Sequence, residues 1–392
     1  MKNQTTRRPT RPRIIRMALR AAFLVPVLAI WTLLSCTTDH VPPGDHPDAE
    51  KYQRIIARFM EAGASGVSVT VRSPKGIWQG AGGYADKGKG VAMSPENTLR
   101  IGSMSKVFTA VTILRLQEEG RLSVTDKISQ YLPTEVTSRI ANAGQATIEQ
   151  CLNHTSGVRE YLGDETIEGI ANGRIVKYSA AQNLALVYDK PADFPLGRGN
   201  YCNTNYLLLS EIIRTVTGKS AYHIVREKAI EPLGLHNTSA SVVLPASLTQ
   251  SYFGTDGTMQ EVTWVDNNAV GGEGQLDGGM ISTSGDVATF LEALLTGKIL
   301  SPASLALMQT YQDIDPSTLP DELKYYKQYG LGLMKIETDH GTAIGHDGHV
   351  YGFVGKVFYL PEHQTTIAIL LNGWSSSSVA VLNAKSTFNL LF

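Results

Sequence analysis

The spacing of apolar and polar positions predicts a helix and a hairpin near the start of the folded part of the chain. Residues 48–62 repeat apolar side chains at the spacing of an amphipathic helix, on a stripe of Tyr52, Ile55, Ile56, Phe59 and Met60. Residues 66–72 alternate like a strand, and a turn at 73–76 leads into residues 77–84, as in a β-hairpin. A short strand at 98–101 then leads into a helical apolar pattern from Ser103 to Gly120.

The rest of the chain is helical first and strand-rich later. Helical patterns lie between residues 120 and 244, at 147–152, 180–188, 201–216 and 221–229. Strand patterns follow at 278–283, 329–337, 342–346, 354–360 and 365–371, with helices at 284–295 and 377–391. Strands from both ends around a helical middle predict an α+β fold, an antiparallel sheet flanked by N- and C-terminal helices with an inserted all-α domain. We expect residues 49–102 and 262–392 to form the sheet domain and residues 103–261 the mostly helical domain.

The N-terminus predicts export and lipid anchoring. The first 20 residues carry seven basic side chains and no acid, and residues 21–34 form an apolar run, as in a secretory signal. Leu33-Leu34-Ser35-Cys36 resembles the lipobox of bacterial lipoproteins, in which the cysteine becomes the lipidated first residue. We therefore expect a signal peptide at 1–35, lipidation of Cys36 and a tether at 36–48, which would hold the protein on a membrane facing the periplasm or the cell surface. An uncleaved membrane anchor is the alternative.

Composition narrows the function further. The chain has 392 residues, of which 42% are hydrophobic and 18% charged, an ordinary globular composition. From Cys36 onwards it carries 28 basic and 36 acidic residues, a net charge of −8, and no basic patch suited to nucleic acid. No metal-ligand cluster, phosphate loop or dinucleotide fingerprint is present, so no metal or cofactor is expected. Cys151 and Cys202 could form one bridge, but two buried free thiols are favoured. The oligomeric state stays open.

Ser103-Met104-Ser105-Lys106 is the first candidate for chemistry. A three-residue spacing at a helix start places Ser103 and Lys106 one turn apart on one face. A serine hydroxyl becomes a nucleophile when a neighbouring base takes its proton, and a lysine can be that base only when it is uncharged. The positive end of the helix disfavours the ammonium form by roughly 0.3–1 kcal/mol, so burial or another cation must lower the lysine pKa further. The alternative interpretation is a capping serine followed by a solvated lysine.

Two further motifs connect this pair with a known family. Ser103-x-x-Lys106, Tyr201-Cys202-Asn203 and His346-Asp347-Gly348 resemble the three motifs of the serine β-lactamase and penicillin-recognising superfamily. The nearest branch is that of the class C β-lactamases, the D-alanyl-D-alanine carboxypeptidases and their esterase relatives. Connecting segments such as His154-Thr155-Ser156-Gly157 and Gly278-Gly279-Met280 extend the resemblance over roughly residues 50–375.

The resemblance implies a role for each motif residue. Ser103 would attack a carbonyl, while Lys106 and Tyr201 would share the acid and base work. Asn203 would donate its amide to the substrate acyl side chain, and His346 and Gly348 would line the substrate site. The backbone N–H groups of Ser103 and His349 would form the oxyanion hole. His154 would be structural.

Departures from the family pattern bear on the substrate. Cys202 adjoins the site with a thiol that could react. Asp347 replaces a threonine that helps hold a substrate carboxylate in penicillin-binding relatives, so it should repel one by about 1–4 kcal/mol. An esterase or amidase therefore ranks at least level with a peptidase, and efficient β-lactamase activity below both. The substrate would be a small molecule or a peptide, with peptidoglycan-derived peptides among the candidates. A non-catalytic penicillin-recognising sensor or binding lipoprotein is the alternative.

Overall fold

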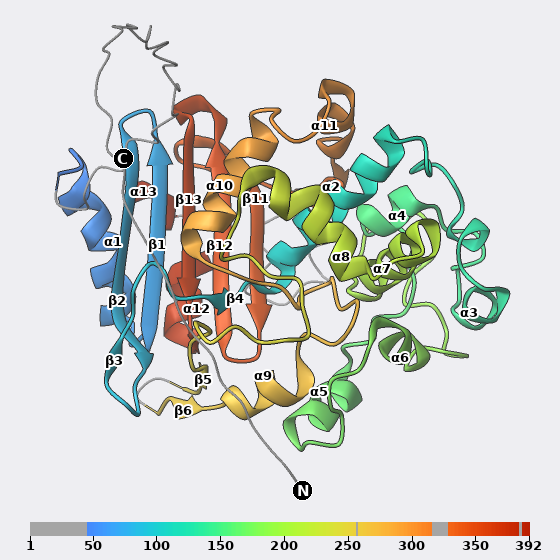
Figure 1. The fold of residues 1–392 in the computed structure, drawn as a ribbon, viewed down its shortest axis with the longest axis horizontal. Coiled ribbons are helices and arrows are strands. Elements are labelled where there is room, and N and C mark those ends of the chain that lie inside the picture. Colours follow the sequence, from blue (N-terminus) through green and yellow to red (C-terminus); the bar gives the residue numbers. More distant parts are fainter. Residues whose placement is uncertain (1–44, 256–257, 316–327, 384–385) are drawn as a thin grey trace, which may run out of the picture. The chain divides into compact units, whose positions relative to one another are not determined.

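A long antiparallel sheet runs through the part of the chain that the computed structural model describes, residues 45–255, 258–315, 328–383 and 386–392 (Figure 1). Its strands are β1 (Gly66–Ser73), β2 (Gly76–Asp86), β3 (Val91–Ala92), β8 (Gln312–Asp313), β9 (Gln328–Tyr329), β10 (Met334–Thr338), β11 (Gly341–Val350), β12 (Phe353–Leu360) and β13 (Thr365–Leu371). Their order is β3-β2-β1-β13-β12-β11-β10-β9-β8. The N-terminal hairpin thus joins the C-terminal strands through the β1–β13 pair, in which Val67 lies opposite Leu371. This confirms the predicted α+β fold with a sheet assembled from both ends.

Both faces of the sheet are buried, as strand β13 illustrates. Ile367, Ile369 and Leu371 belong to the hydrophobic cluster that includes the helices at the two ends of the chain. Ala368 and Leu370, which alternate with them, belong to the cluster on the other face, because successive side chains of a strand point to opposite faces. The first face is covered by α1 (Ala49–Glu61), α12 (Ser376–Asn383) and α13 (Ser386–Asn389), and the second by α10 (Ser284–Leu295).

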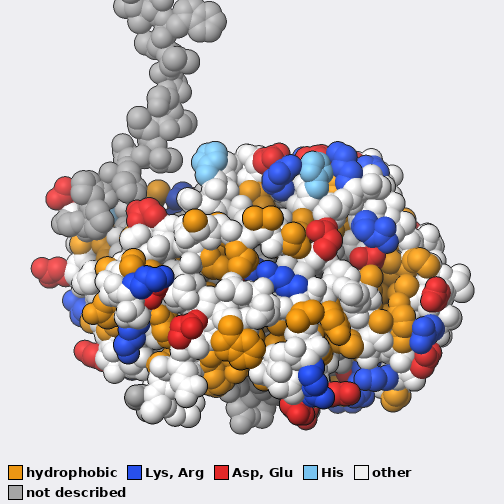
Figure 2. All heavy atoms as spheres, turned by 60° about the horizontal axis from the view of Figure 1, so that its bottom comes forward, with side chains coloured by type: hydrophobic (Ala, Val, Ile, Leu, Met, Phe, Trp, Pro, Cys, Tyr) orange, Lys and Arg blue, Asp and Glu red, His pale blue; other side chains and the backbone are white. Residues whose placement is uncertain are grey.

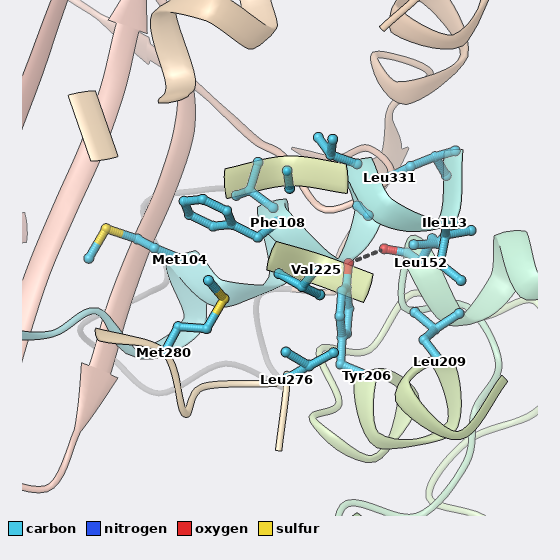
Figure 3. Close-up of a cluster of buried hydrophobic side chains, with 14 of the residues drawn as sticks. Met104, Phe108, Ile113, Leu152, Tyr206, Leu209, Val225, Leu276, Met280 and Leu331 are labelled. Atoms are coloured by element: carbon cyan, nitrogen blue, oxygen red, sulfur yellow. Dashed lines mark hydrogen bonds between the residues drawn. The ribbon is translucent and has the colours of Figure 1, made fainter. Parts of the chain in front are cut away.

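Between the two groups of strands the chain is helical. These helices are α2 (Ser105–Glu118), α3 (Thr134–Arg139), α4 (Ile148–Leu152), α5 (Asp164–Ala171), α6 (Ala180–Ala185), α7 (Thr204–Thr217) and α8 (Ala221–Val225). Residues 105–114 of helix α2 are all buried, and the helix packs against α7 and α8. Figure 3 shows Phe108 and Ile113 of α2 among side chains from several elements, where the Tyr206 hydroxyl donates to the Leu152 carbonyl at 2.8 Å. The predicted domain boundaries at 102/103 and 261/262 stay predictions.

Several short elements connect the large sheet and the long helices. Strand β4 (Leu99–Arg100) pairs with β7 (Ile281–Ser282), and the 3₁₀ turn η1 (Gly102–Met104) joins β4 to α2. A small sheet of β14 (Gly373–Trp374), β5 (Tyr252–Phe253) and β6 (Gln260–Glu261) lies beside α9 (Thr263–Ala269), and α11 (Pro302–Met308) follows α10.

Several predicted elements have other bounds in the structure, as three of them illustrate. The strand predicted at 329–337 is interrupted between β9 and β10, because Gly332 (φ +81°) turns the chain towards α2 and binds the Leu152 carbonyl. The helix predicted at 201–216 begins only at Thr204, because the N–H groups of Cys202 and Asn203 bind side chains outside it. The closing helix predicted at 377–391 is divided into α12 and α13.

On the face shown in Figure 2, acidic and basic side chains are interspersed among apolar ones. Within the residues that the structure describes, no helix combines the length and the apolarity needed to cross a bilayer. The predicted signal peptide, Cys36 and the tether up to residue 44 lie outside the described residues.

Candidate active site

Ser103 and Lys106 meet at the turn between β4 and α2. Ser103 lies in η1, and Lys106 lies in the first turn of α2 with its side chain fully buried. Lys106 Nζ is 3.0 Å from Ser103 Oγ. The structure therefore brings the serine and the lysine of the first motif into hydrogen-bonding contact, and the alternative of a solvated lysine does not apply.

Two further oxygens surround the lysine nitrogen. Asn203 Oδ1 lies 2.7 Å from Nζ and the backbone carbonyl oxygen of Asp277 lies 2.6 Å from it. Burial lowers the pKa of Lys106 to about 8, although the carboxylates of Asp277 and Glu160 act in the opposite direction. At pH 7 about one lysine in ten is then neutral, against about one in three thousand for a solvated lysine. Burial thus increases the fraction of uncharged amine beside the serine hydroxyl by a few hundredfold at pH 7.

Tyr201 of the second motif lies next to this pair. Lys106 Nζ is 5.0 Å from the centroid of the Tyr201 ring, so the two residues expected to share the acid and base work lie close together. The His154 ring also packs against the Tyr201 ring, with a centroid distance of 4.3 Å. His154 Nδ1 accepts from the Cys202 N–H at 3.2 Å, and burial lowers the pKa of His154 well below its usual value. A neutral, buried His154 therefore supports the second-motif loop, in agreement with its predicted structural role.

The backbone of β11 lies directly against the nucleophile turn. A methyl group at Gly348 would lie 1.9 Å from the Ile101 carbonyl oxygen and 3.1 Å from Ser103 N. A methyl group at Gly102, whose φ is +53°, would lie 2.6 Å from His349 N. Only glycines permit this approach, which brings the backbone of Ser103 and that of His349 together. Such paired N–H groups are what an oxyanion hole requires, and their catalytic use stays a prediction.

His346 is buried within this arrangement. It lies in strand β11, which contains the strand predicted at 342–346, and its ring centroid is 6.3 Å from that of Tyr201. Its Nδ1–H donates to the Asp347 carbonyl, so Nε2 accepts from the Tyr329 hydroxyl at 2.8 Å. Burial lowers the pKa of His346 to about 4, so the ring is neutral at pH 7. The third-motif position therefore offers no positive charge to a substrate.

The structure corrects the role expected of Asp347. Asp347 pairs across the strands with Lys356 of β12, and both side chains are buried. Lys356 Nζ lies 5.1 Å from the ring centroid of Phe388 in α13, on the face of the sheet opposite to His346 and Gly348. Asp347 Oδ1 still lies 3.8 Å from His346 Nδ1, but the strand directs the Asp347 side chain to the Lys356 face, so it would not contact a carboxylate bound on the His346 face.

The thiol of Cys202 is also different from expectation. It is buried, and its Sγ lies 3.4 Å from the Val158 carbonyl oxygen. Burial raises the pKa of Cys202 well above its usual value, so it lacks the thiolate form that a nucleophile needs. The expectation that it could react is wrong. Cys151 is likewise buried and free, and burial raises its pKa to about 12.

Sequence reasoning missed three partners of the site: Glu160, Tyr329 and the Asp277 carbonyl. Asp277 contributes a backbone oxygen, which every residue type carries, so no side-chain pattern marks it. Tyr329 and Glu160 lie far in sequence from the groups they bind, His346 and Asn203. Asn203 itself uses its amide oxygen for Lys106 and donates from Nδ2 to Glu160 at 3.2 Å. Its predicted donation to a substrate stays a prediction.

Comparisons with known proteins found a matching family model, related sequences and similar structures. A family model described as Beta-lactamase matches residues 52–390. Penicillin-binding protein 4 of Amycolatopsis lactamdurans is 27% identical over 347 residues, which cover 86% of this chain and 87% of that protein. The structure is similar to a D-stereospecific amidohydrolase from Streptomyces sp., with 27% identity, a TM-score of 0.71 and coverage of 86% of this chain and 98% of the other. It shares the fold of D-amino acid amidase from Ochrobactrum anthropi SV3, with 22% identity, a TM-score of 0.73 and coverage of 87% and 95%.

Proposed function

Since the chain belongs to the β-lactamase family of serine hydrolases, we propose that it cleaves small amides or esters. The reaction would pass through an acyl-enzyme on Ser103, the serine of the first motif. The observation that carries the proposal is the buried Lys106 nitrogen, 3.0 Å from Ser103 Oγ and with its pKa lowered to about 8. A base with a pKa near the working pH is suited to proton transfer. An intact nucleophile and base argue against the alternative of a non-catalytic sensor.

The reaction would proceed in two steps. Neutral Lys106 would take the proton of Ser103 as Oγ adds to the substrate carbonyl carbon, and the N–H groups of Ser103 and His349 would receive the developing oxyanion. Collapse would break the bond to the leaving amine or alcohol, which would take the proton from Lys106 directly or through Tyr201. Water would then hydrolyse the Ser103 ester with the same groups acting in reverse.

Amides of D-amino acids are the favoured substrates. The similar structure from Streptomyces is a D-stereospecific amidohydrolase. A substrate without a carboxylate also suits the site because His346, which occupies the position of the third-motif lysine of the β-lactamases, is uncharged at pH 7. D-alanyl-D-alanine peptides and β-lactams carry a carboxylate for which that position offers no cation.

We expect D-phenylalanine amide to be hydrolysed with a kcat/KM at least about tenfold above that of a D-alanyl-D-alanine peptide, because a missing charge contact costs about 1.4 kcal/mol or more. Intact-mass spectrometry of residues 37–392 should show a fluorophosphonate adduct that Ser103→Ala lacks. Faster turnover of the peptide would contradict the assigned substrate class. Absence of any adduct on the unaltered protein would contradict the acyl-enzyme itself.

We also propose that the protein is exported and anchored through a lipid on Cys36. The support is the basic start, the apolar run and the Leu33-Leu34-Ser35-Cys36 segment. Expressed with radiolabelled palmitate in a bacterium, the full chain should take up label and fractionate with membranes, whereas Cys36→Ser should take up none. Label retained in Cys36→Ser would contradict the anchor site, and an unprocessed N-terminus in the full chain would favour an uncleaved membrane segment.

A further inference from the structure

Glu160 lies beside the catalytic groups but belongs to none of the three motifs. One carboxylate oxygen, Oε1, accepts from the Leu162 N–H at 2.8 Å. The other, Oε2, accepts from the backbone N–H of Asn203 and from its side-chain Nδ2 at 3.2 Å. All three contacts come from N–H donors, so the Glu160 carboxylate acts only as an acceptor here.

This acceptor fixes which way the Asn203 amide points. The amide has one oxygen, which accepts, and one NH₂ group, which donates, and the two ends have nearly the same shape. Glu160 at one end requires the NH₂ group, so the oxygen must point towards Lys106, where it lies 2.7 Å from Nζ. Without Glu160, the amide could rotate by 180° and direct an N–H at the lysine instead.

The orientation of Asn203 in turn decides where the lone pair of a neutral Lys106 points. A neutral amine has two N–H donors and one lone pair. Asn203 Oδ1 and the Asp277 carbonyl oxygen can only accept, and they take the two N–H groups. The third neighbour is Ser103 Oγ at 3.0 Å, whose O–H can donate to the lone pair that remains. This is the geometry that proton removal from the serine requires.

We propose that Glu160 is a positioning residue, which holds the Asn203 amide in the orientation that aims the Lys106 lone pair at Ser103. The proposal rests on the proposed function, in which Lys106 is the base for Ser103. Nothing in the three motifs assigns this task to Glu160, which reaches the site from the segment that follows the His154–Gly157 motif.

A second consequence concerns charge, because Glu160 is one of several groups that act on Lys106. Burial has the largest effect and lowers the pKa of Lys106, whereas the carboxylates of Asp277, Glu160 and Asp347 favour the ammonium form and raise it, in that order. Lys106 in turn lowers the pKa of its two buried histidine neighbours, His154 and His346. The rings of Tyr201 and Tyr206 lie 5.0 and 5.4 Å from its nitrogen, and Asp193 accepts from the Glu160 N–H at 2.8 Å.

The test is the pH dependence of kcat for a neutral activated ester, which carries no amino group that titrates near pH 8, in the unaltered protein and in Glu160→Gln and Glu160→Asp. Activity should rise with pH and level off above about pH 8, because the base form of Lys106 accumulates as the pH passes its pKa of about 8. In Glu160→Gln, the side-chain NH₂ group faces one of the three N–H donors that Glu160 accepts, so the Asn203 amide loses its fixed orientation. We expect kcat to fall by between about 10- and 100-fold, with little change in KM. The inflection of the pH–activity profile of Glu160→Gln should move to lower pH, because the variant lacks the Glu160 charge that favours the ammonium form of Lys106.

The other variants separate charge from contact. Glu160→Asp keeps the charge but is one methylene too short to reach Asn203, so kcat should fall while the inflection stays near that of the unaltered protein. Glu165→Gln, an exposed position on the same segment, is the matched control and should change neither quantity.

A uniform loss of activity in Glu160→Gln with an unmoved inflection would overturn the proposal, as would a kcat within twofold of the unaltered protein. If Glu160→Gln fails to fold by circular dichroism, an unchanged kcat in Glu160→Asp would overturn it. Absence of a fluorophosphonate adduct on the unaltered protein would instead contradict the proposed function.

Discussion

Replacing Lys106 by methionine is expected to lower kcat/KM for an activated ester or a D-amino acid amide by about 10³-fold, the size of a lost general base. The reason is that the ammonium nitrogen lies 3.0 Å from Ser103 Oγ and that burial places its pKa at about 8. Methionine fills a similar volume but cannot take the serine proton. The rate of Ser103 labelling by a fluorophosphonate, followed by intact mass, measures the same step without substrate turnover.

Lys356 provides a matched control for this substitution. It is a second fully buried lysine whose pKa burial lowers to about 8, but it lies on the other face of the sheet beside Phe388. Lys356→Met should reduce stability, because the buried Asp347 carboxylate loses a neighbouring cation, while the folded protein labels at Ser103 within about threefold of the normal rate. Equal loss of labelling in both variants would show that burial of a lysine matters rather than its contact with Ser103. A decrease of less than tenfold in Lys106→Met would contradict its role as the base.

Many of the helices and strands could be predicted from the sequence, because their apolar residues recur with the period of a helix or of a strand. The strip of apolar residues in α1 and the alternation in β1 and β13 report directly which faces are buried. Where the pattern was weaker, tertiary contacts decided: Gly330 and Gly332 divide a predicted strand because the chain must reach Leu152 and α2. Such contacts connect residues far apart in sequence, so local spacing does not reveal them.

The candidate site was predictable where side-chain type and spacing carry the chemistry. Ser103 and Lys106 are three residues apart on one helical turn, so their contact follows from helix geometry. Asp347 illustrates the limit, since its position next to His346 in sequence suggested a shared site. In strand β11 neighbouring residues point to opposite faces, and Asp347 lies with Lys356 behind the sheet. The predicted strand ended at residue 346, so the alternation was not extended to Asp347, whereas β11 continues to Val350.

The buried ion pair ahead of the nucleophile is a second feature that sequence did not indicate. Arg100 of β4 binds Asp266 of α9 with Nε 2.7 Å from Oδ1, and both side chains are fully buried. The guanidinium also donates to the carbonyl oxygens of Gly279 and Val270. Arg100 precedes Ser103 by three residues, and Gly279 follows the Lys106 ligand Asp277 by two. One side chain therefore connects the nucleophile turn to the loop that holds the base.

Asp266→Ala should therefore lower the free energy of unfolding by about 3–5 kcal/mol, because it leaves the Arg100 cation buried without its carboxylate. Denaturant unfolding followed by circular dichroism measures the loss, and Glu168→Ala, from the exposed Arg174–Glu168 pair, should change the same quantity by less than about 1 kcal/mol. The double variant Arg100→Met with Asp266→Leu removes both buried charges and should be more stable than Asp266→Ala alone. If Asp266→Ala costs no more than the surface control, the pair does not secure the nucleophile turn. If the double variant is the less stable of the two, the loss comes from the carbonyl contacts of Arg100 rather than from its unpaired charge.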